Sequence, residues 1–211
     1  QVNDPPVADD EPDVTTNEDT AVTIDVLDGD TDTDQTAGLN AYPSAEVLSI
    51  SIDEAELLDP SHGSIEVVDG KIVYTPAENY NGTDTFEYNV DDGEALDTGL
   101  VTVTIGQVND APVAVADSVT TDEDTAKTID VLANDTDVDT GAGNDGTLHY
   151  RSEFSISLEG NTDPSHGNIE VVDGKIVYTP DANWYGTDTF TYWILDGHGG
   201  SAEGTVTVTV N

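Results

Sequence analysis

Two short stretches of the sequence place aspartate at every second position. They are DTDTD at residues 30–34 and DTDVD at residues 135–139. Carboxylates at positions i and i+2 of a loop can point at one ion, and calcium takes about six to eight oxygen ligands at ~2.3–2.6 Å. The spacing therefore predicts that these loops bind a hard divalent cation.

The same two loops do not match the EF-hand pattern. Position six of an EF-hand loop is glycine and position twelve is glutamate. Here position six is Gln35 or Thr140, and position twelve is Ala41 or Gly146. Any calcium site must therefore collect oxygen ligands from other parts of the chain.

The composition favours cations as ligands and excludes several other partners. The 211 residues contain 45 acidic and 4 basic side chains, which gives a formal net charge of -41. Nucleic acid and anionic membrane surfaces are bound through lysine and arginine, so neither is an expected partner. No apolar run approaches the ~20 residues of a membrane span. Cysteine is absent, which excludes disulfides and thiolate metal sites.

The chain repeats itself once. QVND occurs at residues 1–4 and again at 107–110, and the eighteen residues from 59 to 76 recur at 163–180 with one difference. The offset of ~105 residues is a plausible domain length. The sequence therefore predicts two domains, repeat 1 at residues 1–106 and repeat 2 at 107–211, with QVND at 107–110 as the linker.

Within each repeat the apolar residues alternate with a period of two. The alternation is clear in TFEYNV (85–90) and VTVTI (101–105), and again in TFTYWI (189–194) and TVTVTV (205–210). This pattern is typical of half-buried strands, and the Asp-Gly pair in IEVVDGKIVYTP predicts a tight hairpin turn. The predicted fold is all-β: two tandem antiparallel Greek-key β-sandwiches of the cadherin/Ig-like kind, with about seven strands each.

Several motifs occur in the same order in both repeats. In repeat 2 they read VND-APVA, DEDTAKTIDVLANDTDVD, PSHGNIEVVDGKIVYTP, NWYGTDTFTYWILDGHGG and TVTVTV. This order resembles the bacterial cadherin-like repeat that occurs in tandem in large extracellular (RTX-type) adhesins. The resemblance implies a module outside the cell, stiffened by Ca²⁺ between neighbouring repeats, that supports cell-cell or cell-surface attachment. Polysaccharide or other adhesin chains are further partners that it implies.

The resemblance also implies which residues bind calcium. The ligands come from the first strand, from the Asp-x-Asp loop, from the last hairpin and from the linker. The animal Leu-Asp-Arg-Glu box is missing, and the aspartate of GTDTF stands in for it. The implied set is Glu18, Asp30, Asp32, Asp34, Asp84, Asp92, Asn3 and Asp4 in repeat 1, with Glu123, Asp135, Asp137, Asp139, Asp188, Asp196, Asn109 and Asp110 in repeat 2.

Aromatic residues specific to repeat 2 allow a second interpretation. Trp184, Tyr185 and Trp193 stand where repeat 1 has tyrosine or asparagine. If exposed, these rings could stack on a sugar, and the chain would then be a calcium-dependent carbohydrate-binding module. The structural interpretation is that Trp184 fills a loop against the core.

The sequence does not indicate an enzyme. His62 and His166 lie in DPSHG, where a turn precedes the predicted hairpin, and no serine with an elbow motif accompanies them. Paired carboxylates are numerous, but two intact sandwiches predict no cleft for a glycosidase reaction. GAGNDG at residues 141–146 resembles one calcium-binding nonapeptide repeat, although a single copy is a weak signal.

Overall fold

The computed structural model describes residues 3–33, 48–52, 57–140 and 154–211. Asp34 and the GAGNDG stretch at 141–146 lie outside the described residues, so their predicted roles stay predictions. The described chain is built from strands, with one short 3-10 helix at Val138–Thr140.

The described residues of each repeat form seven strands. In repeat 1 they are β1 (Val14–Asn17), β2 (Val22–Ile24), β3 (Ser49–Ser51), β4 (Gly63–Val68), β5 (Lys71–Pro76), β6 (Gly82–Asp91) and β7 (Leu96–Gly106). In repeat 2 they are β8 (Asp117–Thr121), β9 (Lys127–Ile129), β10 (Ser155–Ser157), β11 (Gly167–Val172), β12 (Lys175–Pro180), β13 (Gly186–Leu195) and β14 (Ser201–Val210). The predicted all-β fold with about seven strands per domain is confirmed.

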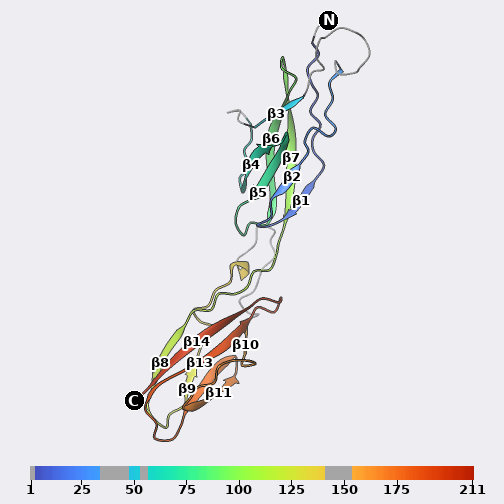
Figure 1. Cartoon of the computed structure of the whole chain (residues 1–211). Helices are drawn as coiled ribbons and strands as arrows, with labels where there is room; N and C mark the ends of the chain where they lie inside the picture. The colour runs from blue at the N-terminus through green and yellow to red at the C-terminus, as the bar shows by residue number, and fades with distance from the viewer. Residues whose placement is uncertain (1–2, 34–47, 53–56, 141–153) are drawn as a thin grey trace. The chain divides into compact units, whose positions relative to one another are not determined.

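The strands of each repeat form one four-stranded and one three-stranded sheet (Figure 1). In repeat 1 the orders are β1-β7-β6-β3 and β2-β5-β4. In repeat 2 they are β8-β14-β13-β10 and β9-β12-β11. Consecutive strands therefore often lie in different sheets, as they do in an Ig-like sandwich.

The first strand of each repeat runs parallel to the last strand. Val14 pairs with Val103 and Asn17 with Gly106 along β1 and β7, and β8 pairs with β14 in the same way. All other strand pairs are antiparallel. The predicted sandwich is therefore antiparallel except for this one pair of strands in each repeat. Periodicity tells which residues face the core, but it carries no information about the direction of a neighbouring strand.

The predicted Asp-Gly hairpins form as the sequence indicates. Asp69 and Gly70 have φ values of 52° and 75°, which are the two positive values that a type I′ turn requires. The turn sets the register of β4 on β5, in which Ile65 pairs with Tyr74 and Val67 with Ile72. The hairpin of β11 and β12, which differs from that of β4 and β5 only in Asn168 for Ser64, adopts the same register in repeat 2.

A buried tyrosine on the sixth strand of each repeat connects the two sheets. Tyr88 lies in the core of repeat 1, and its hydroxyl is within hydrogen-bonding distance of the carbonyls of Asp9 and Val26, at 3.0 and 3.1 Å. Its ring covers Gly99, the residue opposite it on β7. A Cβ atom at Gly99 would lie 2.5 Å from the ring, so only glycine fits there.

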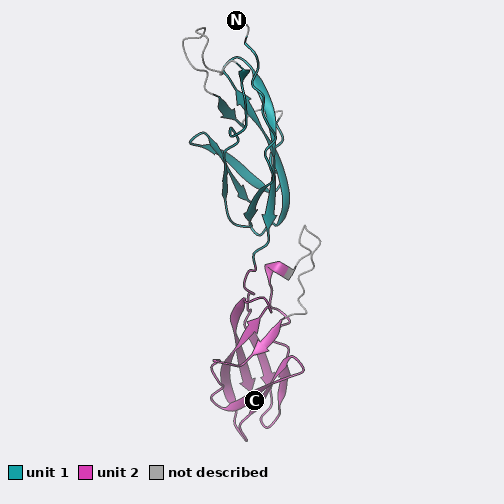
Figure 2. Cartoon of the chain, turned by 90° about the vertical axis from the view of Figure 1, so that its right-hand side faces the viewer, with its two compact units in different colours: residues 1–108, 143–145 teal, residues 109–142, 146–211 magenta. Residues whose placement is uncertain are grey.

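The contacts of the described chain divide it into two compact units (Figure 2). Unit 1 extends to Val108 and corresponds to repeat 1, and unit 2 begins at Asn109 and corresponds to repeat 2. Each unit has its own core of buried aromatic and β-branched side chains. No helix in the described ranges is long and apolar enough to cross a membrane.

Candidate cation site

The predicted ligands of repeat 2 gather where the linker enters the domain. The side-chain amide of Asn109 donates a 2.8 Å hydrogen bond to Oδ2 of Asp196. The backbone N–H of Asp110 donates to Oδ2 of Asp139 at 2.7 Å, and the N–H of Asp139 donates to Oδ1 of Asp137 at 2.9 Å. Five of the predicted ligands are therefore joined by direct contacts within one unit.

Local structure explains why these five residues meet. Asp137 precedes the 3-10 helix and accepts the N–H of Asp139, which is the second residue of that helix. The carboxylate of Asp139 in turn accepts the N–H of the linker residue Asp110. Val113 forms an isolated bridge with Thr136, which holds the linker against the Asp-rich loop. Asp196 follows β13 in the turn before β14. Its Oδ1 accepts the N–H groups of His198 and Gly200, at 2.7 and 3.0 Å.

Several of these carboxylates are removed from water. The exposed fraction is 5% for Asp196, 9% for Asp137 and zero for Asp135. Burial opposes ionisation of Asp196, but hydrogen bonds from Asn109 and from backbone amides outweigh it and lower the pKa of Asp196. Hydrogen bonds from uncharged N–H groups therefore stabilise the ionised form of Asp196 beside the linker.

Asp135 points inside the sandwich and away from the linker contacts. Its Oδ1 accepts the N–H of Val115 at 2.7 Å, and its Oδ2 lies 3.2 Å from the hydroxyl of Tyr192. Asp117 lies 3.4 Å from the same hydroxyl. Burial, together with the charge of Asp135, raises the pKa of Asp117. The sequence did not single out Asp117, because an aspartate before a strand has no distinctive spacing.

Repeat 1 has a similar arrangement at its own N-terminal end. The side-chain amide of Asn3 donates to Oδ2 of Asp92 at 3.1 Å, as Asn109 does to Asp196. Asp4 accepts the hydroxyl of Thr33 at 3.1 Å, and Asp32 is buried. Hydrogen bonds from the N–H groups of Ala95 and Glu94 lower the pKa of Asp92.

Asp30 resembles Asp135 in that it faces the inside of its sandwich. Its Oδ1 accepts the N–H of Asp9 at 2.7 Å, and its Oδ2 is a buried atom with no hydrogen-bond partner among the described residues. Burial, with the charges of Asp9 and Asp97, raises the pKa of Asp30. The pKa of Glu11 is raised by burial and by the charge of Asp30.

The first-strand acids differ between the repeats. Glu18 is buried, and its Oε1 accepts the N–H of Val108 at 2.5 Å. Glu18 thus contacts Val108, which is the last residue of unit 1 and belongs to the QVND linker. Glu123, its counterpart in repeat 2, is exposed, and its N–H donates to the carbonyl of Asn211 at 2.9 Å.

Asp84 and Asp188 lie in a different environment from the other predicted ligands. Oδ1 of Asp84 accepts the N–H groups of Ser61 and Thr85, and Oδ2 accepts the N–H of His62 and the hydroxyl of Tyr74, all at 2.9–3.0 Å. These contacts close the DPSHG turn against the core. Because these bonds hold Asp84 at the DPSHG turn and none of them reaches the linker, the calcium-ligand role of Asp84 and Asp188 stays a prediction.

Replacing Asp188 with asparagine is expected to destabilise repeat 2. Asp188 accepts the N–H groups of Ser165 and His166 and the hydroxyl of Tyr178, and asparagine would place an NH₂ group against one of these donors. The expected loss of unfolding free energy is about 1–3 kcal/mol. Thermal melting checks it, with Asp181→Asn as an exposed control of equal charge change. Equal melting of both variants would contradict the assigned role.

Acidification of the calcium-free protein is expected to change its stability in two opposite steps. Because the folded-state pKa values of Glu11, Asp30 and Asp117 are raised, the folded form binds their protons more readily, and stability rises as pH falls through those values. The pKa values of Asp92 and Asp196 are lowered from 3.8. These two carboxylates therefore stabilise the folded form fully above pH 3.8, and this stabilisation is lost as the pH falls below that value. Urea unfolding between pH 7 and pH 2 should therefore show a maximum in mild acid. A steady decline from pH 7 would contradict it.

The donor chemistry at the linker end of repeat 2 suits calcium. Across the described residues, no three acidic or histidine side chains already converge on one point as a metal-binding group. Coordination therefore needs rotation of the carboxylates. A carboxylate that accepts an N–H keeps lone pairs for an ion, and calcium tolerates such irregular sets of oxygen ligands.

The aromatic residues of repeat 2 mostly serve packing. Trp184 packs against the core and stacks on His166, with ring centroids 4.5 Å apart and an interplanar angle of 3°. Tyr80 stacks on His62 in the same way in repeat 1. Tyr185 is 75% exposed, whereas Trp193 is half-buried. These contacts favour the structural interpretation of Trp184 over a sugar-binding platform.

Fold and sequence together define a tandem Ig-like β-sandwich protein of bacterial type. The sequence profile described as the bacterial Ig domain matches twice, at residues 3–104 and 109–209. The chain therefore belongs to the bacterial Ig domain family. No curated protein sequence matches it.

Solved structures with a similar fold include cadherin ectodomains. Repeats EC21-23 of human CDH23 are 14% identical, with 95% of this chain and 67% of that chain covered at a TM-score of 0.52. Domains 3-6 of protocadherin gamma B2 are 20% identical, with 100% and 52% covered and a TM-score of 0.45. The similarity to CDH23 shows the fold alone, and the similarity to protocadherin gamma B2 carries no argument.

A family 107 endo-fucoidan hydrolase also shows partial similarity. It is 17% identical, with 97% of this chain covered at a TM-score of 0.35. This chain spans only 28% of the length of that hydrolase. Ig-like and cadherin-like domains are typically non-catalytic, and this weak partial likeness carries no argument for catalysis.

Proposed function

We propose that this chain is a calcium-binding spacer module of a bacterial extracellular adhesin. The observation that carries the proposal is the contact of linker residues Asn109 and Asp110 with Asp196 and Asp139. An ion held among these oxygens would fasten the linker to the body of repeat 2. The chain between the repeats would then lose rotational freedom, and the module would become stiffer.

The charge of the chain supports a cation-dependent function. A net charge of -41 makes the compact state repel itself, and bound cations reduce that repulsion. Extracellular calcium modules commonly bind at ~10⁻⁴–10⁻³ M. We propose Asn109, Asp110, Asp137, Asp139 and Asp196 as the ligands in repeat 2. Their counterparts in repeat 1 are Asn3, Asp4, Asp32 and Asp92.

The proposed role of the module is structural. Its partners would be neighbouring repeats of the same chain. The whole protein would attach to a cell or a surface, and this module would serve as a spacer within it. We propose no catalytic role. Packing of Trp184 on the core disfavours the carbohydrate-binding alternative.

Calcium titration by calorimetry tests the proposal. The wild-type chain is expected to bind calcium, and a variant combining Asp139→Asn with Asp196→Asn is expected to lose the repeat 2 site. Glu66→Gln with Glu170→Gln removes the same charge from exposed strand positions and should leave binding unchanged. Equal binding by the two double variants would show that calcium is not held at the linker end.

A second measurement tests the stiffening role itself. Fluorophores attached to β6 and β13 report the distribution of distances between the two repeats. Calcium is expected to narrow this distribution in the wild-type chain and in the glutamine control, but not in the variant lacking the site. If calcium binds but leaves the distance distribution unchanged, the bound ion does not stiffen the chain between the repeats.

A further inference from the structure

The strand β4 forms an edge of the three-stranded sheet in repeat 1. Among the strands that the structure describes it pairs only with β5, and β11 has the same edge position in repeat 2. Edge strands are usually protected by charge, proline, shortness or a covering segment, because their unpaired backbone groups can bind another strand. β4 instead has six residues and two partly exposed valines, with exposed fractions of 41% for Val67 and 42% for Val68.

The hairpin register shows which backbone groups face outward. The turn at Asp69 and Gly70 makes Val68 and Lys71 the first hydrogen-bonded pair of a two-residue hairpin. Hydrogen-bonded and non-hydrogen-bonded pairs alternate along antiparallel strands. The N–H and C=O groups of Ile65 and Val67 therefore point away from β5, toward the unoccupied edge. Among the described residues, no backbone contact outside the hairpin involves either of them.

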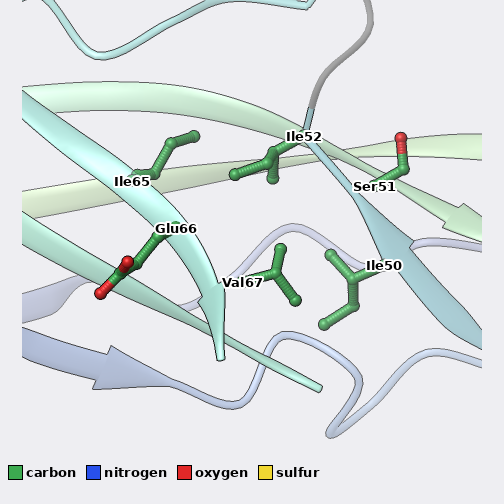
Figure 3. Close-up of a pocket in the computed structure, with 6 residues that line it drawn as sticks. All are labelled: Ile50, Ser51, Ile52, Ile65, Glu66 and Val67. Atoms are coloured by element: carbon green, nitrogen blue, oxygen red, sulfur yellow. The ribbon is translucent and has the colours of Figure 1, made fainter. Parts of the chain in front are cut away.

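The same two residues border a groove of about 410 Å³ between β3 and β4, in which apolar side chains lie beside Ser51 and Glu66 (Figure 3). The opposite wall is formed by Ile50, Ser51 and Ile52. Figure 3 shows the side chains of Ile50, Ile52 and Val67 converging between the strands, while the carboxylate of Glu66 points to the other side of β4. An apolar side chain could therefore enter the groove at the point where the backbone edge is available.

The charge of the chain determines what kind of segment fits. A second copy of this chain would bring another formal charge of -41 against the first, which opposes edge-to-edge pairing of two copies. A basic segment would instead be attracted by this net charge, to which Glu66 contributes from the other side of β4. The available backbone groups require an extended polypeptide, and the groove requires apolar side chains at alternate positions.

We propose that the β4 edge is a docking site for a cationic, extended polypeptide segment. The segment adds as a new strand beside β4, exchanging backbone hydrogen bonds with Ile65 and Val67 and placing one apolar side chain between Val67 and Ile50. The proposal does not rest on calcium binding. Because IEVVDGKIVYTP is identical in repeat 2, the β11 edge offers the same backbone pattern through Ile169 and Val171.

Amide hydrogen exchange with a defined probe tests the docking mode. The probe is a short synthetic peptide that alternates valine and lysine, added to the whole chain at physiological salt. Binding is expected to protect the amides of Ile65 and Val67, whereas Glu66 and Val68 already bond to β5 and should change little. Uniform protection of all four amides, or of none, would overturn the proposal.

A chemically matched peptide separates strand addition from simple charge attraction. The control has the same sequence, but every second backbone amide is N-methylated, so its charge is kept while its donors on one edge are lost. Strand addition predicts binding at least about tenfold weaker for this control, because backbone hydrogen bonds are lost. Equal binding of both peptides would show that only electrostatics acts.

Paired variants locate the site on the protein. Val67→Lys with Val171→Lys places charge at the groove, whereas Val68→Lys with Val172→Lys adds the same charge on the opposite side of the strands. The first variant is expected to weaken binding about tenfold relative to the second, through loss of the apolar contact. Equal affinities would overturn the assignment. Sedimentation showing a dimer that only the first variant disrupts would also overturn it, in favour of a second copy as the occupant.

Discussion

Millimolar calcium is expected to raise the melting temperature of this protein by about 5–10 °C. An ion that binds only the folded form stabilises it by RT ln(1 + [L]/Kd). With a Kd of ~10⁻⁴ M and calcium at ~10⁻³ M, one site contributes about 1.4 kcal/mol. A domain of ~100 residues gains roughly 4–8 °C for each kcal/mol. Differential scanning calorimetry with and without a chelator measures the shift.

Two controls make this result specific. Magnesium is expected to have a much smaller effect, because it demands octahedral geometry and keeps its waters. The variant Asp139→Asn with Asp196→Asn is expected to lose the shift of repeat 2, and the glutamine control at Glu66 and Glu170 should keep it. A melting curve that chelation leaves unchanged would contradict calcium binding by the folded chain.

Replacement of Gly99 by alanine is expected to be among the most destabilising single changes in repeat 1. The new Cβ would lie 2.5 Å from the ring of Tyr88 and 2.6 Å from its hydroxyl oxygen. Tyr88 cannot retreat without breaking its contacts with the carbonyls of Asp9 and Val26. Overpacking of this kind costs about 1–3 kcal/mol, and rigid surroundings place Gly99→Ala at the upper end.

Gly106→Ala is a matched control on the same strand. There the added Cβ would lie 3.1 Å from the side-chain oxygen of Asn17 and 3.6 Å from the carbonyl oxygen of Thr16. Gly99→Ala is expected to produce a separate, earlier melting transition for repeat 1, with repeat 2 unchanged. Gly204→Ala should have the reverse effect, because Gly204 faces Tyr192 in the same way. Similar melting of Gly99→Ala and Gly106→Ala would show that the core yields to the extra methyl group.

Local signals in the sequence predicted most of the fold. The Asp-Gly pairs require positive φ at both turn positions, so both the hairpins and their register follow from two residues. The alternation in VTVTI and TVTVTV correctly predicted the core faces of β7 and β14. The parallel pairing of β1 with β7 was not predictable, because it depends on how the chain crosses between the sheets.

The sequence predicted the candidate site less well than it predicted the fold. Asp84 and Asp139 both follow a threonine or valine in an Asp-rich region, and nothing local distinguishes them. Only the tertiary structure shows that Asp84 accepts hydrogen bonds from the DPSHG turn, whereas Asp139 meets the linker. Asp117 was missed because its neighbours Tyr192 and Asp135 come from distant segments.

Tension applied to the two ends of a repeat would load its first and last strands in shear. Because β1 and β7 are parallel, pulling the N-terminal end of one and the C-terminal end of the other slides the two strands along each other. The four residue pairs from Val14–Val103 to Asn17–Gly106 then share the force and must rupture together. Antiparallel terminal strands would instead open one pair at a time. Five parallel pairs join β8 to β14, so both domains are built to withstand stretching along the chain.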